Sequence, residues 1–154
     1  MKKIIFIGKN SCGKTSLCQL MKGEEVRDKK TQTIEIYEDI IDTPGQYIED
    51  ICYYGALIIT AAEVEIIALV QEYGDMFGKI PPAFGATFGR KVIGIITKMD
   101  KALENSKCNK DILEVEKQLI LAGAEKIFKV SIFSENSIKI LEEYINSNCR
   151  KNTI

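Results

Sequence analysis

The chain has 154 residues, of which 45% are hydrophobic and 28% are charged. This length and composition predict one globular domain over residues 1–154. The 21 basic and 22 acidic residues are interspersed and give a formal net charge of -1, which argues against nucleic acid or an anionic membrane as a partner. Because the chain has no histidine, histidine-based general base catalysis and the common zinc sites are excluded.

The cysteines and the apolar stretches bear on where the protein works. The five cysteines are odd in number and form no C-x-x-C pair, as expected for reduced thiols in a cytosolic protein. No apolar stretch approaches the roughly 18 residues of a membrane span, and the run after Lys2 and Lys3 is too short for a secretory signal. We therefore expect a cytoplasmic protein without membrane insertion.

The chain begins with a short apolar run, Lys2–Ile7, whose β-branched and aromatic residues predict a buried strand. The next eight residues match the pattern G-x-x-x-x-G-K-T in a strand-then-helix context. Gly8 and Gly13 let backbone N–H groups converge on an anion, and a helix beginning near Lys14 adds the positive end of its dipole. This segment predicts a phosphate loop made of Gly8, Lys9, Asn10, Ser11, Cys12, Gly13, Lys14 and Thr15.

Three side chains of this loop have expected roles. Lys14 would reach the β- and γ-phosphates, and Thr15 would offer its hydroxyl to Mg²⁺, a hard ion that takes few protein ligands. Cys12 lies beside Lys14 and a helix N-terminus, an environment that lowers a thiol pKa, but we expect the commoner arrangement in which a small side chain packs inward. A simple glycine-bearing turn between strand and helix is the alternative to a phosphate loop.

The segment after the phosphate loop predicts a helix that ends at Gly23, a polar loop over 24–30, and a strand signal over Thr31–Asp42. This last stretch is too short for two full strands and a turn, so one of them is expected to be stunted. A second helix is expected over Tyr47–Ala62, with an inward face formed by Ile48, Ile51, Tyr54 or Gly55, and Ile58.

Two buried strands, Val64–Val70 and Val92–Thr97, flank a loop over 73–90 with a short helix near Ala83–Phe88. A helix with Asn109 as its N-cap and Gly123 as its stop, a strand over Lys126–Ile132 and a final helix capped by Ser134 complete the chain. This order predicts a three-layer α/β fold, with a mostly parallel sheet of five to six strands covered on both faces and an abbreviated second strand.

Polar motifs follow the carboxyl ends of the predicted strands, which places Lys14, Asp42 and Asp100 along one rim of the sheet. Asp42 ends a strand and suits a carboxylate that holds Mg²⁺, directly or through water. Gly45 would bring a backbone N–H to the γ-phosphate. Taken alone, the segment from Asp42 to Gly45 is more typical of a simple β-turn, and its position downstream of a phosphate loop is what favours a role at the site.

The segment Thr97-Lys98-Met99-Asp100 matches the [NT]-K-x-D pattern of nucleotide-base recognition. A carboxylate accepts hydrogen bonds from the N1–H and the exocyclic amine of guanine, whereas adenine presents an acceptor at N1. Asp100 would therefore select guanine, and the stem of Lys98 would pack on the base. An ordinary solvated Lys-x-Asp pair at a strand end is the alternative.

The chain resembles the EutP/PduV family of small P-loop GTPase-like proteins. The resemblance is carried by four segments in a short chain: the phosphate loop, Lys30-Thr31-Gln32-Thr33, the segment from Asp42 to Gly45, and Thr97-Lys98-Met99-Asp100. The resemblance spans essentially the whole chain. It implies a small GTPase-like P-loop NTPase fold, Mg²⁺ and GTP as ligands with ATP as an alternative, and a role in ethanolamine or propanediol utilisation. It also implies a cytoplasmic or bacterial microcompartment location, with microcompartment proteins as partners.

The resemblance also implies roles for four further positions. A threonine of the first switch loop closes on Mg²⁺ and the γ-phosphate in such families, which leaves Thr31 or Thr33, and we favour Thr31. Gln46 occupies the place of a glutamine that orients the attacking water, and a solvated turn glutamine is the alternative. Ser131 lies in the last base-contact loop, where Ile132 replaces the usual alanine.

The resemblance leaves three functions open. The first is a GTP-hydrolysing switch whose ordered state a partner recognises. The second is an ATP-dependent acetate kinase that forms acetyl phosphate, for which Arg27, Lys9 and Lys30 are the cations available near the γ-phosphate. The third is a module that binds nucleotide without hydrolysing it. The first two would use Lys14, Thr15 and Asp42 alike, because phosphoryl transfer depends on positioning and charge.

Overall fold

A computed structural model describes residues 1–78, 80–104 and 108–149. Its strands form one sheet in the order β2-β3-β1-β4-β5-β6. Neighbouring strands are parallel except β2 and β3, which are antiparallel, and β2 has two residues. The predicted mostly parallel sheet with an abbreviated second strand is therefore confirmed. The strands are β1 (Lys2–Ile7), β2 (Glu35–Ile36), β3 (Ile40–Asp42), β4 (Val64–Glu72), β5 (Lys91–Thr97) and β6 (Lys126–Lys129).

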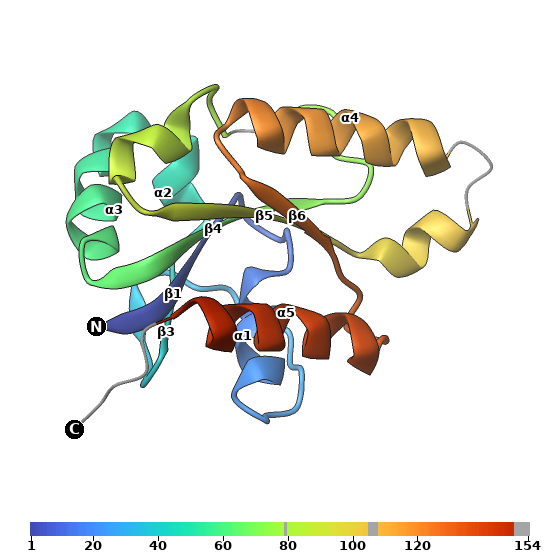
Figure 1. Ribbon diagram of the computed structural model, residues 1–154, viewed down its shortest axis with the longest axis horizontal. Coiled ribbons are helices and arrows are strands. Elements are labelled where there is room, and N and C mark those ends of the chain that lie inside the picture. Colours follow the sequence, from blue (N-terminus) through green and yellow to red (C-terminus); the bar gives the residue numbers. More distant parts are fainter. Residues whose placement is uncertain (79, 105–107, 150–154) are drawn as a thin grey trace.

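Helices cover both faces of the sheet (Figure 1). Successive side chains of a strand point to opposite faces, and β1 accordingly contributes Ile5 and Ile7 to one buried cluster, Ile4 and Phe6 to the other. The first cluster packs under α3 and α4 and the second under α1 and α5, which confirms the three layers. The helices are α1 (Lys14–Met21), α2 (Gln46–Glu49), α3 (Tyr54–Ala61), α4 (Cys108–Leu121) and α5 (Glu135–Asn148), with 3₁₀ turns at Ile51–Tyr53, Phe84–Phe88 and Met99–Glu104.

The helix predicted over Tyr47–Ala62 is wrong, because the chain breaks into α2, a 3₁₀ turn and α3. Asp50 has an extended backbone, and its side chain accepts a hydrogen bond of 3.0 Å from the N–H of Cys52. An aspartate that bonds the backbone two residues on competes with helix continuation. The expected inward face is right at Ile48, which is buried, and at Tyr54, which packs against the core, but wrong at Ile51 and Ile58, which are exposed. Leu57 is buried in their place.

Two other boundaries differ from those predicted. The strand expected over Lys126–Ile132 ends at Lys129, and Val130 and Ser131 stay buried as the chain turns toward the rim. Asn109 is not an N-cap, because α4 begins at Cys108 and includes it; the residues directly before α4 lie outside those described. Such boundaries commonly shift by one or two residues. The cap at Ser134 is confirmed, as its side chain accepts a hydrogen bond from the N–H of Ser137.

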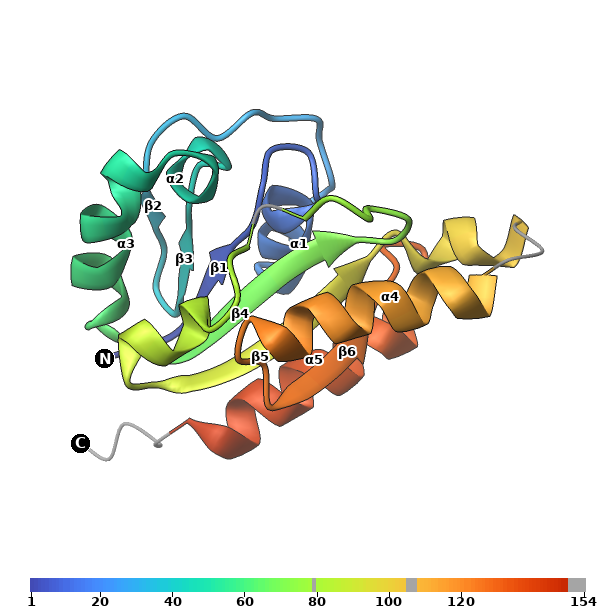
Figure 2. The ribbon, with the colours of Figure 1, turned by 90° about the horizontal axis from the view of Figure 1, so that it is seen from above.

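The parallel register brings the ends of the strands together. Phe6 pairs with Asp42, and Glu72 pairs with Thr97, so the polar residues that end β3, β4 and β5 lie beside the loop that follows β1. Thr43 fastens this arrangement by donating a hydrogen bond of 2.7 Å from its hydroxyl to the carbonyl of Phe6. Seen from above, the loop between α1 and β2 runs past the loop between β1 and α1 (Figure 2).

Candidate functional site

The loop Gly8–Thr15 connects the central strand β1 to α1. Two positions of this loop require glycine, each for a different structural reason. A Cβ at Gly8 would lie 2.3 Å from the carbonyl oxygen of Val70, so only glycine allows β4 to approach. Gly13 has a φ of 99°, a left-handed conformation that glycine adopts without strain. The loop therefore has a close approach to β4 and a left-handed turn, both of which the predicted phosphate cradle needs.

Lys14 lies folded against this loop. Its Nζ donates a hydrogen bond of 2.8 Å to the carbonyl of Lys9, and the side chain is almost fully buried. The thiol of Cys12 lies 3.6 Å from the same Nζ and is fully buried, which confirms that it packs inward. Burial raises the pKa of this thiol although the neighbouring Lys14 lowers it, in keeping with the expected inward packing. Lys14 is thus held against the phosphate loop by the carbonyl of Lys9.

Three oxygen-bearing side chains from separate elements meet beside Lys14. The hydroxyls of Thr15 and Thr31 lie 2.6 Å apart, and both donate to Oδ2 of Asp42, at 2.8 and 3.0 Å. Asp42 is fully buried, and burial raises its pKa above the usual value for an aspartate. Of the two candidate threonines, the structure brings Thr31 here, whereas Thr33 is exposed.

This cluster fits Mg²⁺. Oδ1 of Asp42 is buried and has no hydrogen-bond partner, which leaves a carboxyl oxygen able to bind a cation or its water. The two threonine hydroxyls are hard oxygen ligands as well. Within the described residues there is no group of three or more His, Cys, Asp or Glu side chains that could hold a metal.

The start of α2 lies against the phosphate loop. A Cβ at Gly45 would lie 2.1 Å from the backbone nitrogen of Asn10, so glycine is required at this contact. The N–H of Asn10 also donates to Oε1 of Glu49 at 3.4 Å, a contact that the sequence did not reveal. Gln46 is the first residue of α2 and is exposed, outside the residues that line the adjacent cavity.

A cavity of about 400 Å³ lies over these groups. Lys9 is not part of its lining, because its Nζ forms an ion pair of 3.0 Å with Oδ2 of the buried Asp75, which raises the pKa of Lys9. Gly8 and Cys12 lie behind the loop in the core. We call this space the phosphate cavity; its lining is Asn10, Ser11, Gly13, Lys14, Thr15, Ser16, Arg27, Asp28, Lys29, Lys30, Thr31, Thr43, Gly45 and Lys98.

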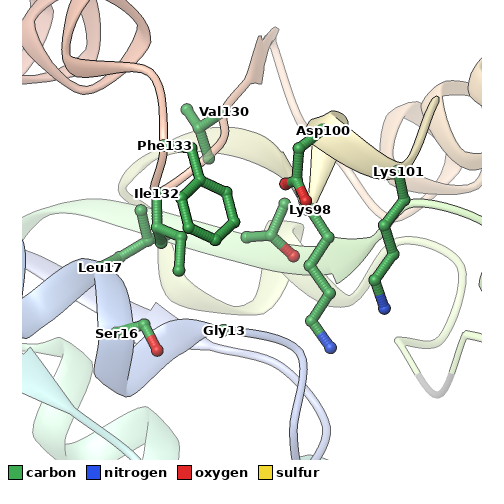
Figure 3. A pocket seen from close by; sticks show the side chains of 10 residues that line it. Gly13, Ser16, Leu17, Lys98, Asp100, Lys101, Val130, Ile132 and Phe133 are labelled. Atoms are coloured by element: carbon green, nitrogen blue, oxygen red, sulfur yellow. The ribbon is translucent and has the colours of Figure 1, made fainter. Parts of the chain in front are cut away.

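A second cavity of about 200 Å³ adjoins the first and shares Gly13, Ser16 and Lys98 with it. Asp100 stands at one side of it and accepts a hydrogen bond of 2.9 Å from the hydroxyl of Ser131 (Figure 3). We call this space the base pocket. Its lining is largely apolar and consists of Gly13, Ser16, Leu17, Thr97, Lys98, Asp100, Lys101, Val130, Ile132 and Phe133.

Residues at the end of β5 bond to the phosphate loop and so fix the boundary between the two cavities. The hydroxyl of Thr97 donates to the carbonyl of Cys12, and the Nζ of Lys98 donates to the carbonyl of Ser11 at 2.7 Å. Lys98 also forms an ion pair of 2.5 Å with Glu72 at the end of β4. All four residues predicted for the base side, Thr97, Lys98, Asp100 and Ser131, are therefore gathered next to the phosphate loop.

The sequence analysis missed three residues at this rim. Glu72 ends β4 and Asp75 follows it, so the rule that ligands bind beyond strand ends could have indicated both. Phe133 comes directly after Ile132, and its closeness to the predicted base-contact loop was the available signal. In the part of the chain that the structure describes, no helix is long and apolar enough to cross a membrane.

Comparisons with known proteins agree on the family and the fold. Propanediol utilization protein PduV of Citrobacter freundii is 40% identical over 147 residues, which cover 96% of this chain and 95% of that protein. The probable acetate kinase EutP of Escherichia coli (strain K12) is 29% identical over 150 residues, covering 96% of this chain and 91% of that protein.

A solved structure matches at the level of the fold. The crystal structure of the bacterial selenocysteine-specific elongation factor EF-Sec superposes with a TM-score of 0.67 at 22% identity and covers 96% of this chain. The chain spans 29% of the length of that protein. The family model described as ethanolamine utilisation and propanediol utilisation, PduV-EutP, matches residues 1–147. The chain therefore belongs to the PduV-EutP family.

Proposed function

We propose that this protein binds GTP with Mg²⁺ and hydrolyses it, as a small switch that serves ethanolamine or propanediol utilisation. The observation that carries the proposal is the junction of the two cavities through Lys98, whose Nζ bonds the phosphate loop while its stem lines the base pocket. A nucleotide spanning both cavities would place its phosphates over Lys14 and its base beside Asp100. The protein would act in the cytoplasm or on a microcompartment, with microcompartment proteins as partners.

The chemistry asks for positioning and charge. An oxygen of water attacks the γ-phosphorus, the bond from that phosphorus to the β–γ bridging oxygen breaks, and GDP and phosphate leave. Lys14 would neutralise charge on the β- and γ-phosphate oxygens, and Gln46, at the start of α2 directly after Gly45, would orient the water. Thr15, Thr31 and Asp42 would hold Mg²⁺, which stabilises negative charge on the phosphates when bound.

The same contacts give the protein a switch. Thr31 belongs to the exposed loop between α1 and β2 and reaches the site through hydroxyl hydrogen bonds. Gly45 begins the segment that contacts the phosphate loop at Asn10. A γ-phosphate would hold both segments in place, and its loss would release them, so that a partner can distinguish the two states.

An ATP-dependent acetate kinase is the second candidate. Arg27, Lys29 and Lys30 line the phosphate cavity and could position a carboxylate near the γ-phosphate. A carboxylate oxygen would then attack the γ-phosphorus, giving acetyl phosphate and ADP. The name of the relative in Escherichia coli agrees with this candidate.

One incubation separates the candidates. Purified protein with Mg²⁺ is given GTP or ATP, with and without acetate, and nucleoside diphosphate, phosphate and acetyl phosphate are measured. We expect GDP and phosphate from GTP at a rate that acetate does not change. Acetyl phosphate from ATP would assign the kinase instead, and nucleotide binding without turnover would leave a binding module. In equilibrium competition we expect GTP to bind more tightly than ATP, and equal or stronger ATP binding would overturn the guanine assignment.

A further inference from the structure

Glu49, the last residue of α2, places a carboxylate on the phosphate loop. Its Oε1 accepts a hydrogen bond of 3.4 Å from the backbone N–H of Asn10, the third residue of that loop. Within the described residues no lysine or arginine forms an ion pair with this carboxylate. Backbone N–H groups of a phosphate loop are donors for anionic ligands. An acidic side chain of the protein therefore occupies a donor that a phosphate ligand would use.

The contact lies where the γ-phosphate is expected. Gly45 is the N-cap of α2, and the sequence assigns its N–H to the γ-phosphate. A Cβ on Gly45 would lie 2.1 Å from the backbone nitrogen of Asn10 and 2.5 Å from its Cα, so the two backbones are in direct contact. Asn10, Gly45 and Glu49 therefore meet on the side of the loop that a terminal phosphate would approach.

The contacts of Gly45 and Glu49 with Asn10 belong to one short element. The N–H of Glu49 donates to the carbonyl of Gly45 at 3.4 Å, so both residues lie on the same helical turn. Asp50 follows with an extended backbone and separates this turn from α3. Glu49 is exposed, so its side chain can leave the loop for water without uncovering apolar surface. A movement that draws Gly45 away from Asn10 would carry Glu49 with it.

We propose that Glu49 competes with the γ-phosphate for the phosphate loop and so determines the preference of the site between a nucleoside diphosphate and a triphosphate. The inference rests on the proposed function, because it assumes a nucleotide on the loop. A diphosphate leaves the N–H of Asn10 to Glu49, whereas a triphosphate brings negative charge to the same place and displaces the carboxylate. Glu49 then anchors α2 in one state, and the γ-phosphate anchors it at Gly45 in the other.

Two nucleotides that differ by the γ-phosphate test this competition. Titration calorimetry with Mg²⁺ gives the affinities for GDP and for GMPPNP, a non-hydrolysable analogue of GTP. Glu49→Gln removes the charge and keeps the length of the side chain. We expect it to raise the affinity for GMPPNP by about 5- to 30-fold, a modest factor because the group is exposed, and to change the affinity for GDP by less than about twofold. Glu49→Ala, which also removes the acceptor, should favour GMPPNP at least as much.

The matched control is Glu114→Gln. Glu114 is an exposed residue of α4 and is not among the residues lining either cavity, so this variant removes the same charge elsewhere. Both affinities should equal those of the wild type. A merely structural role of Glu49 would lower the melting temperature and shift the affinities for GDP and GMPPNP alike.

Polyphosphates test whether the competition occurs at the loop itself. Pyrophosphate and tripolyphosphate have neither base nor ribose, so they probe the phosphate cavity alone. Glu49→Gln should strengthen binding of tripolyphosphate by a factor similar to that for GMPPNP and leave binding of pyrophosphate unchanged. A gain seen with GMPPNP but not with tripolyphosphate would overturn the competition at the phosphate loop.

The possible failures are distinguishable. Wild-type protein that binds no nucleotide and no polyphosphate would overturn both the proposed function and this inference. Wild-type protein that binds GDP, together with an unchanged ratio of GMPPNP to GDP affinity in Glu49→Gln, would overturn the role of Glu49 alone. Weaker binding of GMPPNP by Glu49→Gln would also overturn it, because Glu49 would then help to hold the triphosphate.

Discussion

The phosphate cavity and the base pocket adjoin but are built differently. The phosphate cavity surrounds the end of the central strand β1, and its backbone is fixed by close contacts at Gly8 and Gly45. Its side chains are polar and bond one another, as Thr15, Thr31 and Asp42 do. The base pocket is largely apolar and lies on the β5 and β6 side of the sheet.

Because of this difference, we expect the phosphate cavity to recognise the phosphates of a ligand and the base pocket to recognise its base. A cradle of backbone N–H groups and a buried ammonium recognise any chain of phosphates, whatever is attached to it. The base pocket depends on a few side chains that follow β5 and β6, chiefly Asp100 and Phe133. Variants in the first region should therefore change binding of all phosphate ligands, and variants in the second should change only the contribution of the base.

The largest effect is expected from Lys14→Ala. Loss of charge-assisted hydrogen bonds to two phosphate groups should weaken GTP, ATP and tripolyphosphate alike, by at least about 100-fold, while the protein stays folded. Titration calorimetry with each ligand measures this, and circular dichroism checks the fold. Lys129→Ala is the matched control, because Lys129 pairs with Glu116 on β6 and α4, away from both cavities. A variant that kept its affinity would disprove the phosphate loop.

The sequence predicts the phosphate cavity better than the base pocket, because the phosphate cavity depends on backbone shape and the base pocket on a few side chains. Apolar runs in the sequence predict buried strands, so β1 and the strand that ends at Asp42 are predictable. The G-x-x-x-x-G-K-T pattern specifies a backbone shape and so predicts the loop after β1. The role of Thr31 rather than Thr33 depends on how an exposed loop folds back onto Asp42, which no periodicity encodes. The break at Asp50 likewise results from one side-chain hydrogen bond that competes with helical spacing.

The sequence predicted one wall of the base pocket but not the other. The pattern from Thr97 to Asp100 marks one wall, but the opposite wall depends on where the chain turns after β6. The strand ends at Lys129, so the chain turns earlier than expected, and Ser131 and Phe133 come to lie next to Asp100. A boundary shift of a few residues, which pattern reasoning resolves poorly, decides which side chains enter the pocket.

A smaller and more selective effect is expected from Asp100→Asn. Guanine presents N1–H and an amine to the carboxylate, whereas xanthine has a carbonyl in place of the amine, to which an amide can donate. GTP affinity should fall by about 10- to 100-fold and XTP affinity should rise, with tripolyphosphate binding unchanged. Competition between GTP, XTP and tripolyphosphate measures the shift. An unaltered ratio of GTP to XTP affinity would show that Asp100 does not contact the base.

The smallest effect in these comparisons is a change of stability at the metal cluster. Burial raises the pKa of Asp42 in the folded protein above its value in the unfolded chain, so between these two pKa values the folded state binds a proton more readily than the unfolded state. The free energy of unfolding of the nucleotide-free protein should consequently fall as pH rises from the ordinary aspartate pKa through the raised one. Asp42→Asn removes this penalty at neutral pH.

Thermal melts of the wild type and Asp42→Asn test this sign. Without nucleotide, the variant should melt higher at pH 7, by about 2–4 °C for each kcal/mol relieved, and the difference should vanish at a pH below the ordinary aspartate pKa. With Mg²⁺ and GDP the order should reverse, because only the wild type offers the ionised oxygen of Asp42 to the cation and gains the stability that binding provides. A variant that melts lower than the wild type at pH 7 without nucleotide would show that hydrogen bonding from Thr15 and Thr31 outweighs the cost of burying the charge. The reversal measures the free energy that the nucleotide-free protein loses by burying the ionised carboxyl group of Asp42 without a cation. The base pocket has no such cost, because its carboxylate, Asp100, is only half-buried.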